Sequence, residues 1–311
     1  MKMLGLFLFF LLSCGKFGNK DKPSVYTPTL RDLTFDKLQI YRRSSQARME
    51  DSGYFRDLGC DSLLFASLAS ASGVNVPIEN YRSEDGKWFR TPEHNCYDEK
   101  RSSSDISKDM FTGLWWALYT HSKRSLIDEL IQYGEGHEQY LFWIMGRGDI
   151  SRVGIPPPAQ ATWYEMRYRL GGKDNANRFI PQIWSKLDGF ESHLQVIHIL
   201  LLGRLTSQID DHAKSRLKEY ALREPENALY QAAWHLYYDG NMDSAYRILL
   251  SESKFPALSL PTSDNYCTEY LFQRDMLKNG GVNPDWLPCP HENKQYSGID
   301  FLFAAKIALG E

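Results

Sequence analysis

Two acidic residues stand one helical turn apart in the stretch SSSDISKDMFTGLWWALY, residues 102–119, directly ahead of a pair of tryptophans. The acids are Asp105 and Asp109, and the rings are Trp115 and Trp116. Glycosidic bonds are cleaved between two carboxyl groups about 5–10 Å apart, and aromatic faces offer hydrophobic area on which sugar rings stack. The stretch is therefore a candidate site for glycan binding and acid–base cleavage. The simpler alternative is that both acids stabilise a helix start, by accepting backbone N–H bonds and by complementing the helix dipole.

Asp61 raises the same question, because it follows Gly59 and Cys60 at a second predicted helix start. It is a third candidate catalytic acid, with capping of the helix as the alternative. Trp88 lies in the stretch RSEDGKWFR, where a short hairpin is expected, and is a further candidate for sugar stacking. These residues extend the glycan hypothesis beyond the stretch 102–119.

Two arginines, Arg147 and Arg152, flank Asp149 and follow Trp143 in a glycine- and proline-marked crossing. A guanidinium group binds a carboxylate in two-pronged fashion, so the pair could hold an acidic glycan or a peptide carboxylate. A salt-bridged loop is the alternative. His291, in the stretch PCPHENKQY, is the more exposed of the histidines by its context and is added as a candidate substrate contact.

The chain lacks the sequence motifs of several classes of protein. No GxSxG, Walker, Rossmann or HExxH motif is present, so no cofactor and no metal site are expected. His193 and His198 are five residues apart in an apolar helix, which is the wrong spacing for a shared metal and typical of core residues. The net charge is −3 and the charges are mixed along the chain, which argues against a nucleic-acid partner.

The first fourteen residues, MKMLGLFLFFLLSC, have the pattern of an export signal: a positive start, an apolar run and a small residue ahead of Cys14. Ten apolar residues rise about 15 Å, which is too short for a hydrocarbon core of about 30 Å. The ending LLSC resembles the lipobox of bacterial lipoproteins. That resemblance implies removal of residues 1–13, acylation of Cys14, and anchoring to a bacterial membrane, with the outer membrane or the periplasmic face favoured. Cleavage near Ser13 with an unmodified Cys14 is the alternative.

Residues 14–30 are rich in glycine, lysine and proline, and we expect them to form a flexible tether ahead of a single domain at 31–311. Export would also place the other four cysteines in an oxidising compartment, where an even number of cysteines favours disulfides. Proximity favours the pairs Cys60–Cys96 and Cys267–Cys289. Four buried free thiols are the alternative, and zinc is disfavoured because no CxxC pair is present.

Hydrophobic periodicity predicts a mainly helical chain from residue 58 onward. The expected helices are 60–72, 104–121, 124–133, 158–170, 179–186, 193–206, 211–222, 228–238, 242–250 and a closing apolar helix near 298–310. Small residues dominate 60–72, so another helix can approach it closely. The segment 74–101 is expected to be a long excursion, pinned by Cys96, that forms a wall or lid. Short turns between helices favour an all-α fold of antiparallel hairpins.

Two architectures fit this organisation. The stretch ENALYQAAWHLYYDGNMDSAYRILL resembles one tetratricopeptide or Sel1-type unit, with Ala233, Gly240 and Ala245 where two helices cross. Residues 55–310 as a whole resemble the (α/α) toroids, which include six-hairpin glycosidases and polysaccharide lyases. The second resemblance implies a ring of helical hairpins and a glycan as substrate.

The sequence thus leads to one main hypothesis and one alternative. The first is a lipid-anchored exported protein that binds a glycan through the tryptophans named above, with cleavage of the glycan by the acids as a further hypothesis. The alternative is a non-catalytic helical-repeat scaffold or adaptor of the cell envelope, whose partner is a protein bound near residues 190–250. A factor in peptidoglycan maintenance is a third option.

Overall fold

The computed structural model describes residues 27–96, 106–136, 142–146, 149–153, 157–171, 187, 189–252, 255 and 298–311. The described helices are α1 (Leu30–Arg48), α2 (Ser62–Ala71), α3 (Lys108–Thr120), α4 (Arg124–Gly136), α5 (Pro157–Arg169), α6 (Gly189–Thr206), α7 (Asp211–Arg223), α8 (Ala228–Tyr238), α9 (Asp243–Leu249) and α11 (Ile299–Leu309). Two 3-10 turns, η1 (Arg56–Asp61) and η2 (Ile78–Tyr81), join them. The prediction of a mainly helical protein is confirmed.

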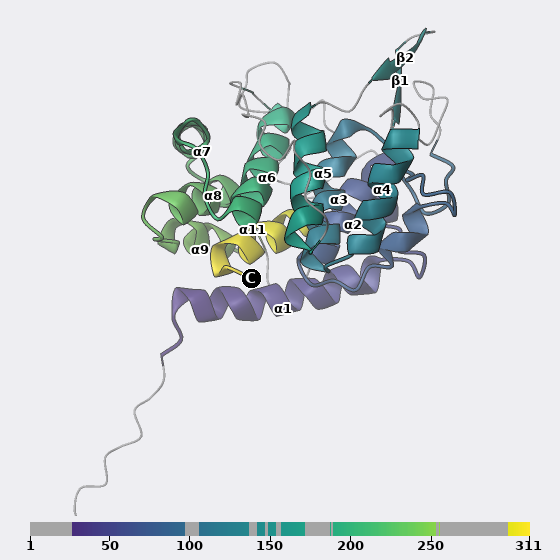
Figure 1. Ribbon diagram of the computed structural model, residues 1–311. Coiled ribbons are helices and arrows are strands. Elements are labelled where there is room, and N and C mark those ends of the chain that lie inside the picture. Colours follow the sequence, from purple (N-terminus) through teal and green to yellow (C-terminus); the bar gives the residue numbers. More distant parts are fainter. Residues whose placement is uncertain are drawn as a thin grey trace, which may run out of the picture.

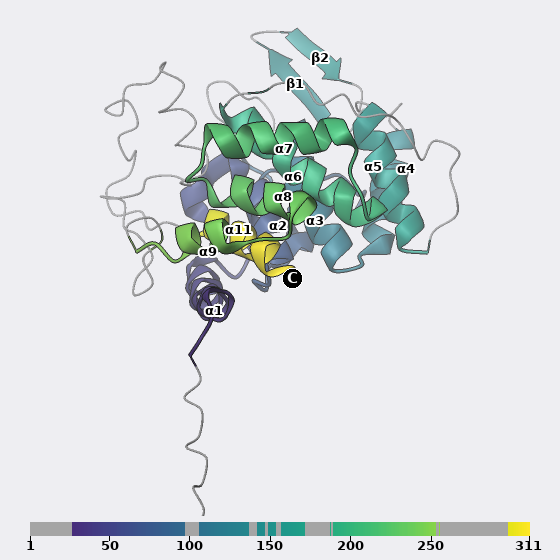
Figure 2. The same ribbon diagram turned by 90° about the vertical axis from the view of Figure 1, so that its left-hand side faces the viewer.

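A two-stranded antiparallel sheet interrupts the helices where we expected an irregular crossing. Strand β1 (Phe142–Gly146) pairs with β2 (Asp149–Val153), in a register that sets Trp143 opposite Arg152. The pair projects from the molecule on the side opposite α1, as Figures 1 and 2 show. The expectation of an irregular crossing is therefore corrected, because the backbone on both sides of residues 147–148 is extended and paired, with Gly146 opposite Asp149.

Helix α1 was not expected from the sequence. It begins at a capping box in which the Thr29 side chain accepts from the Asp32 backbone and Asp32 accepts from the Thr29 backbone. Its buried side packs on α11, where the rings of Tyr41 and Phe301 stack with centroids 4.0 Å apart. Figure 1 shows α1 running along one side of the molecule beneath the other helices.

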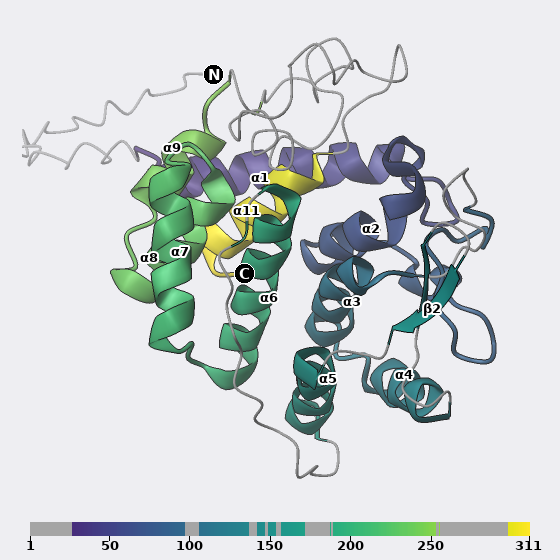
Figure 3. The same ribbon diagram turned by 90° about the horizontal axis from the view of Figure 1, so that it is seen from above.

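Helix α11 lies in the core, and all eleven of its residues are buried. Figure 3 shows it between α1 and the helices α6, α8 and α9. The end of the chain is fixed next to it, because Arg42 pairs with the Glu311 carboxylate and Arg204 donates to the Glu311 carbonyl at 3.0 Å. This central helix connects the two helix groups seen in Figure 3, α2–α5 and α6–α9.

Helices α2 and α3 pack closely through small residues, as the composition of 60–72 predicted. A Cβ placed on Gly113 of α3 would lie 2.3 Å from the Leu64 carbonyl oxygen of α2. Only glycine therefore allows this approach of the two backbones.

The segment 74–96 is packed into the protein rather than extended from it. Val74, Ile78, Tyr81 and Trp88 are all buried. The expected short hairpin is present as a turn closed by a bridge between Arg82 and Trp88. The segment returns to the start of α2 through the disulfide Cys60–Cys96, whose Cα atoms are 5.6 Å apart. This first expected disulfide is shown, whereas Cys267 and Cys289 lie outside the described residues.

Among the helices that the structure describes, none combines the length and the apolar character needed to cross a bilayer.

Candidate functional site

The three candidate acids are not brought together by the described residues. Asp105 lies outside them, and Asp109 lies in the first turn of α3 with its side chain outside the description. Asp61 stands at the N-cap of α2, yet its carboxylate makes no capping bond there. Instead it pairs with Arg90 at 3.4 Å, and the same guanidinium donates to the Cys60 carbonyl at 3.4 Å. Asp61 thus helps to fasten the segment 74–96 beside the disulfide.

The three candidate tryptophans are core side chains. Trp88, Trp115 and Trp116 expose 3%, 3% and 1% of their surface. Trp116 donates its indole N–H to the Ile197 carbonyl of α6 at 3.0 Å. The centroids of the Trp115 and His198 rings are 5.3 Å apart. Such burial favours the packing interpretation over sugar stacking, because none of the three rings presents a face to solvent.

The remaining candidates lie where side chains are not described. Arg152 belongs to β2, and Arg147, His291 and Cys14 fall outside the described residues. Their expected functions stay predictions.

The two histidines of α6 confirm the expectation of core residues. His193 is buried, and its Nε2 lies 3.1 Å from Asn227 Nδ2. His198 Nε2 lies 3.0 Å from the Thr162 hydroxyl, and burial lowers the pKa of His198 to about 4. The His198 imidazole is therefore neutral at neutral pH.

A different place, between α7 and α8, has the form of a binding site. Helix α7 begins at Asp210, whose side chain accepts from the Ala213 backbone at 2.6 Å. Helix α8 is capped by Asn227, whose side chain accepts from the Tyr230 backbone at 3.3 Å. The Tyr230 hydroxyl lies 2.6 Å from Ser192 Oγ of α6, within the core. Both helix starts and the α6–α8 contact are thus fixed by buried or capping polar groups.

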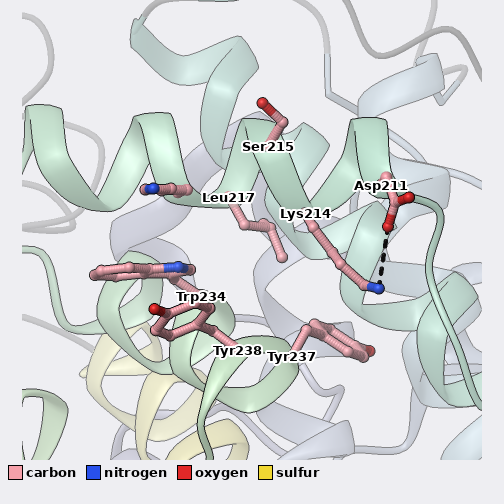
Figure 4. A pocket seen from close by; sticks show the side chains of 8 residues that line it. Asp211, Lys214, Ser215, Leu217, Trp234, Tyr237 and Tyr238 are labelled. Carbon is pink, nitrogen blue, oxygen red and sulfur yellow. Dashed lines mark hydrogen bonds and ion pairs between the residues drawn. The ribbon is translucent and has the colours of Figure 1, made fainter.

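An open pocket of about 230 Å³ lies between these two helices. Figure 4 shows the side chains that line it, with Leu217 and Lys214 of α7 extending toward the aromatic side chains of α8. The lining residues are Asp211, Lys214, Ser215, Leu217 and Lys218 from α7, and Trp234, Tyr237 and Tyr238 from α8. The volume is below the ~300–1,000 Å³ typical of sites for drug-sized ligands. The pocket volume suits a single ring of a longer ligand.

The α8 side of the pocket is an aromatic wall. The rings of Trp234 and Tyr238 stack with centroids 5.4 Å apart and planes 26° apart. Tyr238 is 68% exposed, so a ligand can reach its ring. Large aromatic rings that stay exposed on a folded surface offer hydrophobic area to a binding partner.

Tyr237 forms the deeper part of the wall. A Cβ on Gly203 of α6 would lie 1.8 Å from the Tyr237 hydroxyl, so the ring fits against α6 only because residue 203 is glycine. Burial raises the pKa of Tyr237 to about 12, and the hydroxyl therefore stays protonated at neutral pH. Packing on α6 holds this ring in place before any ligand binds.

The α7 side of the pocket carries charge. Lys214 Nζ lies 3.3 Å from an Asp211 oxygen, and the two side chains are 48% and 99% exposed. Lys218, one turn further along α7, makes no ion pair within the described part of the chain. Two lysines and one aspartate leave the pocket with an excess of one positive charge.

Sequence reasoning missed this site although its residues follow regular spacings. Trp234, Tyr237 and Tyr238 are at i, i+3 and i+4 on α8, and Lys214 and Lys218 are at i and i+4 on α7. An aromatic row of this kind usually packs in a core, and a pair of lysines usually lies on a solvated face. Only the tertiary structure reveals that the two rows line a common pocket, in which Tyr238 is exposed and the other two rings are partly buried.

Within the described ranges no group of three or more His, Cys, Asp and Glu side chains could hold a metal ion. Comparison of the chain with models of protein families, with curated proteins and with solved structures gave no match. The geometry of the α7–α8 pocket is therefore the basis for assigning a function.

Proposed function

We propose that this protein is an exported, lipid-anchored helical protein that binds a glycan in the α7–α8 pocket. The observation that carries the proposal is the stacked pair of the partly buried Trp234 and the exposed Tyr238, opposite lysine side chains in an open pocket. A sugar ring has one apolar face of C–H groups and an edge of hydroxyl groups. The apolar face suits the α8 rings, and the hydroxyl edge suits the polar side chains of α7.

The proposal concerns binding. Hydrolysis would need a second carboxyl group about 5–10 Å from the first. Asp211 is the one carboxylate among the described lining residues, and it is paired with Lys214. Cleavage remains a hypothesis that rests on Asp61, Asp105 and Asp109.

Replacing Tyr238 by alanine is expected to weaken glycan binding about tenfold, which equals about 1.4 kcal/mol. The reason is the loss of half of the aromatic wall, while the 68% exposure of the ring leaves the core intact. Calorimetric titration of wild-type and Tyr238→Ala protein with neutral and acidic oligosaccharides, including chitotriose and trigalacturonate, measures the change.

The matched control is Tyr168→Ala, which removes a partly exposed tyrosine of α5 remote from the pocket residues. Its affinity should equal that of the wild type. Equal affinities for all three proteins, or no binding by the wild type to any oligosaccharide tested, would refute a glycan site in this pocket.

The lipid anchor rests on the LLSC ending of the export signal. Cells grown on labelled palmitate are expected to label the wild-type protein and not the Cys14→Ala variant. Equal labelling of both proteins would show that Cys14 is not the acylated residue.

The ring of helical hairpins implied by the toroid resemblance is likewise a proposal. It is supported by the mainly helical fold with short connections between α7, α8 and α9. The second candidate function is the envelope adaptor. It is supported by large apolar side chains exposed on α7 and α8, which are Leu222, Leu236 and Tyr238. Failure of every glycan to bind would favour this second candidate.

A further inference from the structure

We infer that the α7–α8 pocket selects a sugar that carries a carboxylate over the same sugar without one. This inference rests on the proposed function, and it names the class of ligand. The ring of the sugar would stack on Trp234 and Tyr238, and its carboxylate would meet Lys218 and Lys214.

The first support is the balance of charge along α7. Arg216 Nη1 lies 2.6 Å from Glu219 Oε2, so these two charges compensate each other. Asp211 compensates Lys214 in the same way. Lys218 is then the uncompensated cation among the α7 residues that line the pocket. One extra positive charge matches one carboxylate on a ligand.

The second support is the weakness of the pair that holds Lys214. The Asp211 side chain is 99% exposed, and ion pairs between exposed side chains contribute little because water screens them. Lys214 can therefore turn from Asp211 to a ligand at small cost. Its long side chain lets Nζ follow an anionic substituent whose position is set by the stacked ring.

The third support is the direction of the side chains. Figure 4 shows Lys214 and Leu217 extending from α7 toward the rings of Trp234, Tyr237 and Tyr238 on α8. Lys214 therefore reaches from α7 into the space that the rings of α8 line. A neutral sugar would use the rings and hydroxyl contacts to α7, and a sugar with a carboxylate on the edge away from the rings would add ion pairs with the lysines.

The test uses two sugars that differ by a single group. N-acetylmuramic acid is N-acetylglucosamine with a lactyl ether that carries a carboxylate. Wild-type protein titrated in low salt is expected to bind the acid about fivefold more tightly, an effect in the range of exposed ion pairs. The preference should shrink in 0.3 M salt, where charges are screened over about 5–6 Å.

Lys218→Gln should remove most of this preference, because the affinity for N-acetylmuramic acid should fall more than the affinity for N-acetylglucosamine. Lys123→Gln is the control, because it removes one positive charge from an exposed lysine that pairs with Glu79, outside the pocket. It should keep the wild-type preference.

The outcomes distinguish the claim of a glycan site from the claim that this site selects a carboxylate. Equal binding of the two sugars by wild-type protein overturns the charge selection and leaves the glycan site standing. A preference that survives in Lys218→Gln overturns the assignment to this lysine. Tighter binding of N-acetylglucosamine 6-phosphate than of N-acetylmuramic acid overturns the carboxylate as the preferred anion. Binding of none of these sugars contradicts the proposed function itself.

Discussion

Replacing Gly113 by alanine is expected to lower the free energy of unfolding by about 3 kcal/mol. The new Cβ would lie 2.3 Å from the Leu64 carbonyl oxygen, which belongs to the backbone of α2 and cannot turn aside. Helices α2 and α3 would have to separate, and the buried residues between them would lose contacts. Chemical denaturation of the two proteins, followed by circular dichroism, measures the difference.

A second variant tests whether the backbone is the cause. Leu64→Ala removes the Leu64 side chain, whose Cδ1 would lie 2.9 Å from the new methyl group, but keeps the carbonyl. Adding Leu64→Ala to Gly113→Ala should therefore not restore stability. The close approach of α2 to α3 would be wrong if Gly113→Ala were as stable as the wild type, or more stable through the higher helix propensity of alanine.

Removing the disulfide Cys60–Cys96 is expected to cost about 3–4 kcal/mol. The bond closes a loop of 36 residues in sequence, and losing it returns conformational freedom mainly to the unfolded chain. The double variant Cys60→Ala/Cys96→Ala is preferable to a reducing agent, because the other cysteines then stay as they are. Thermal and denaturant unfolding measure the loss.

Asp61→Asn is the control for the surroundings of this disulfide. It removes the ion pair with Arg90, which joins the same two segments, and should cost under about 1 kcal/mol because the Asp61 side chain is 50% exposed. An alanine double variant as stable as the wild type would contradict the importance of the bond.

Much of the helical structure could be predicted from the sequence, because the apolar periodicity of a surface helix is a local signal. Helix α8 begins and ends at the predicted residues, 228 and 238. Helix α1 was missed although Thr29 and Asp32 form a capping box, because its N-terminal turn adjoins the polar segment assigned to the tether. The strands β1 and β2 were missed because strand pairing depends on a neighbour that the local pattern does not specify.

The candidate site was harder to predict for a related reason. Trp116 and Trp234 are both tryptophans in apolar helices, yet one is 1% exposed and the other lines a pocket. The difference comes from what packs against each helix, which only the tertiary structure determines. Trp116 lies against α6 and α11, whereas Trp234 lines the pocket between α7 and α8.

The most direct test of the glycan site is the NMR spectrum of the tryptophan indole N–H groups during titration with an oligosaccharide. The chain has eight tryptophans. The indole N–H signal that is missing from the spectrum of Trp234→Phe belongs to Trp234. The account predicts a saturable shift of the Trp234 signal, with the signals of the buried Trp88, Trp115 and Trp116 unmoved. A shift of the Trp115 and Trp116 signals with Trp234 unmoved, or no shift at any tryptophan, would contradict it.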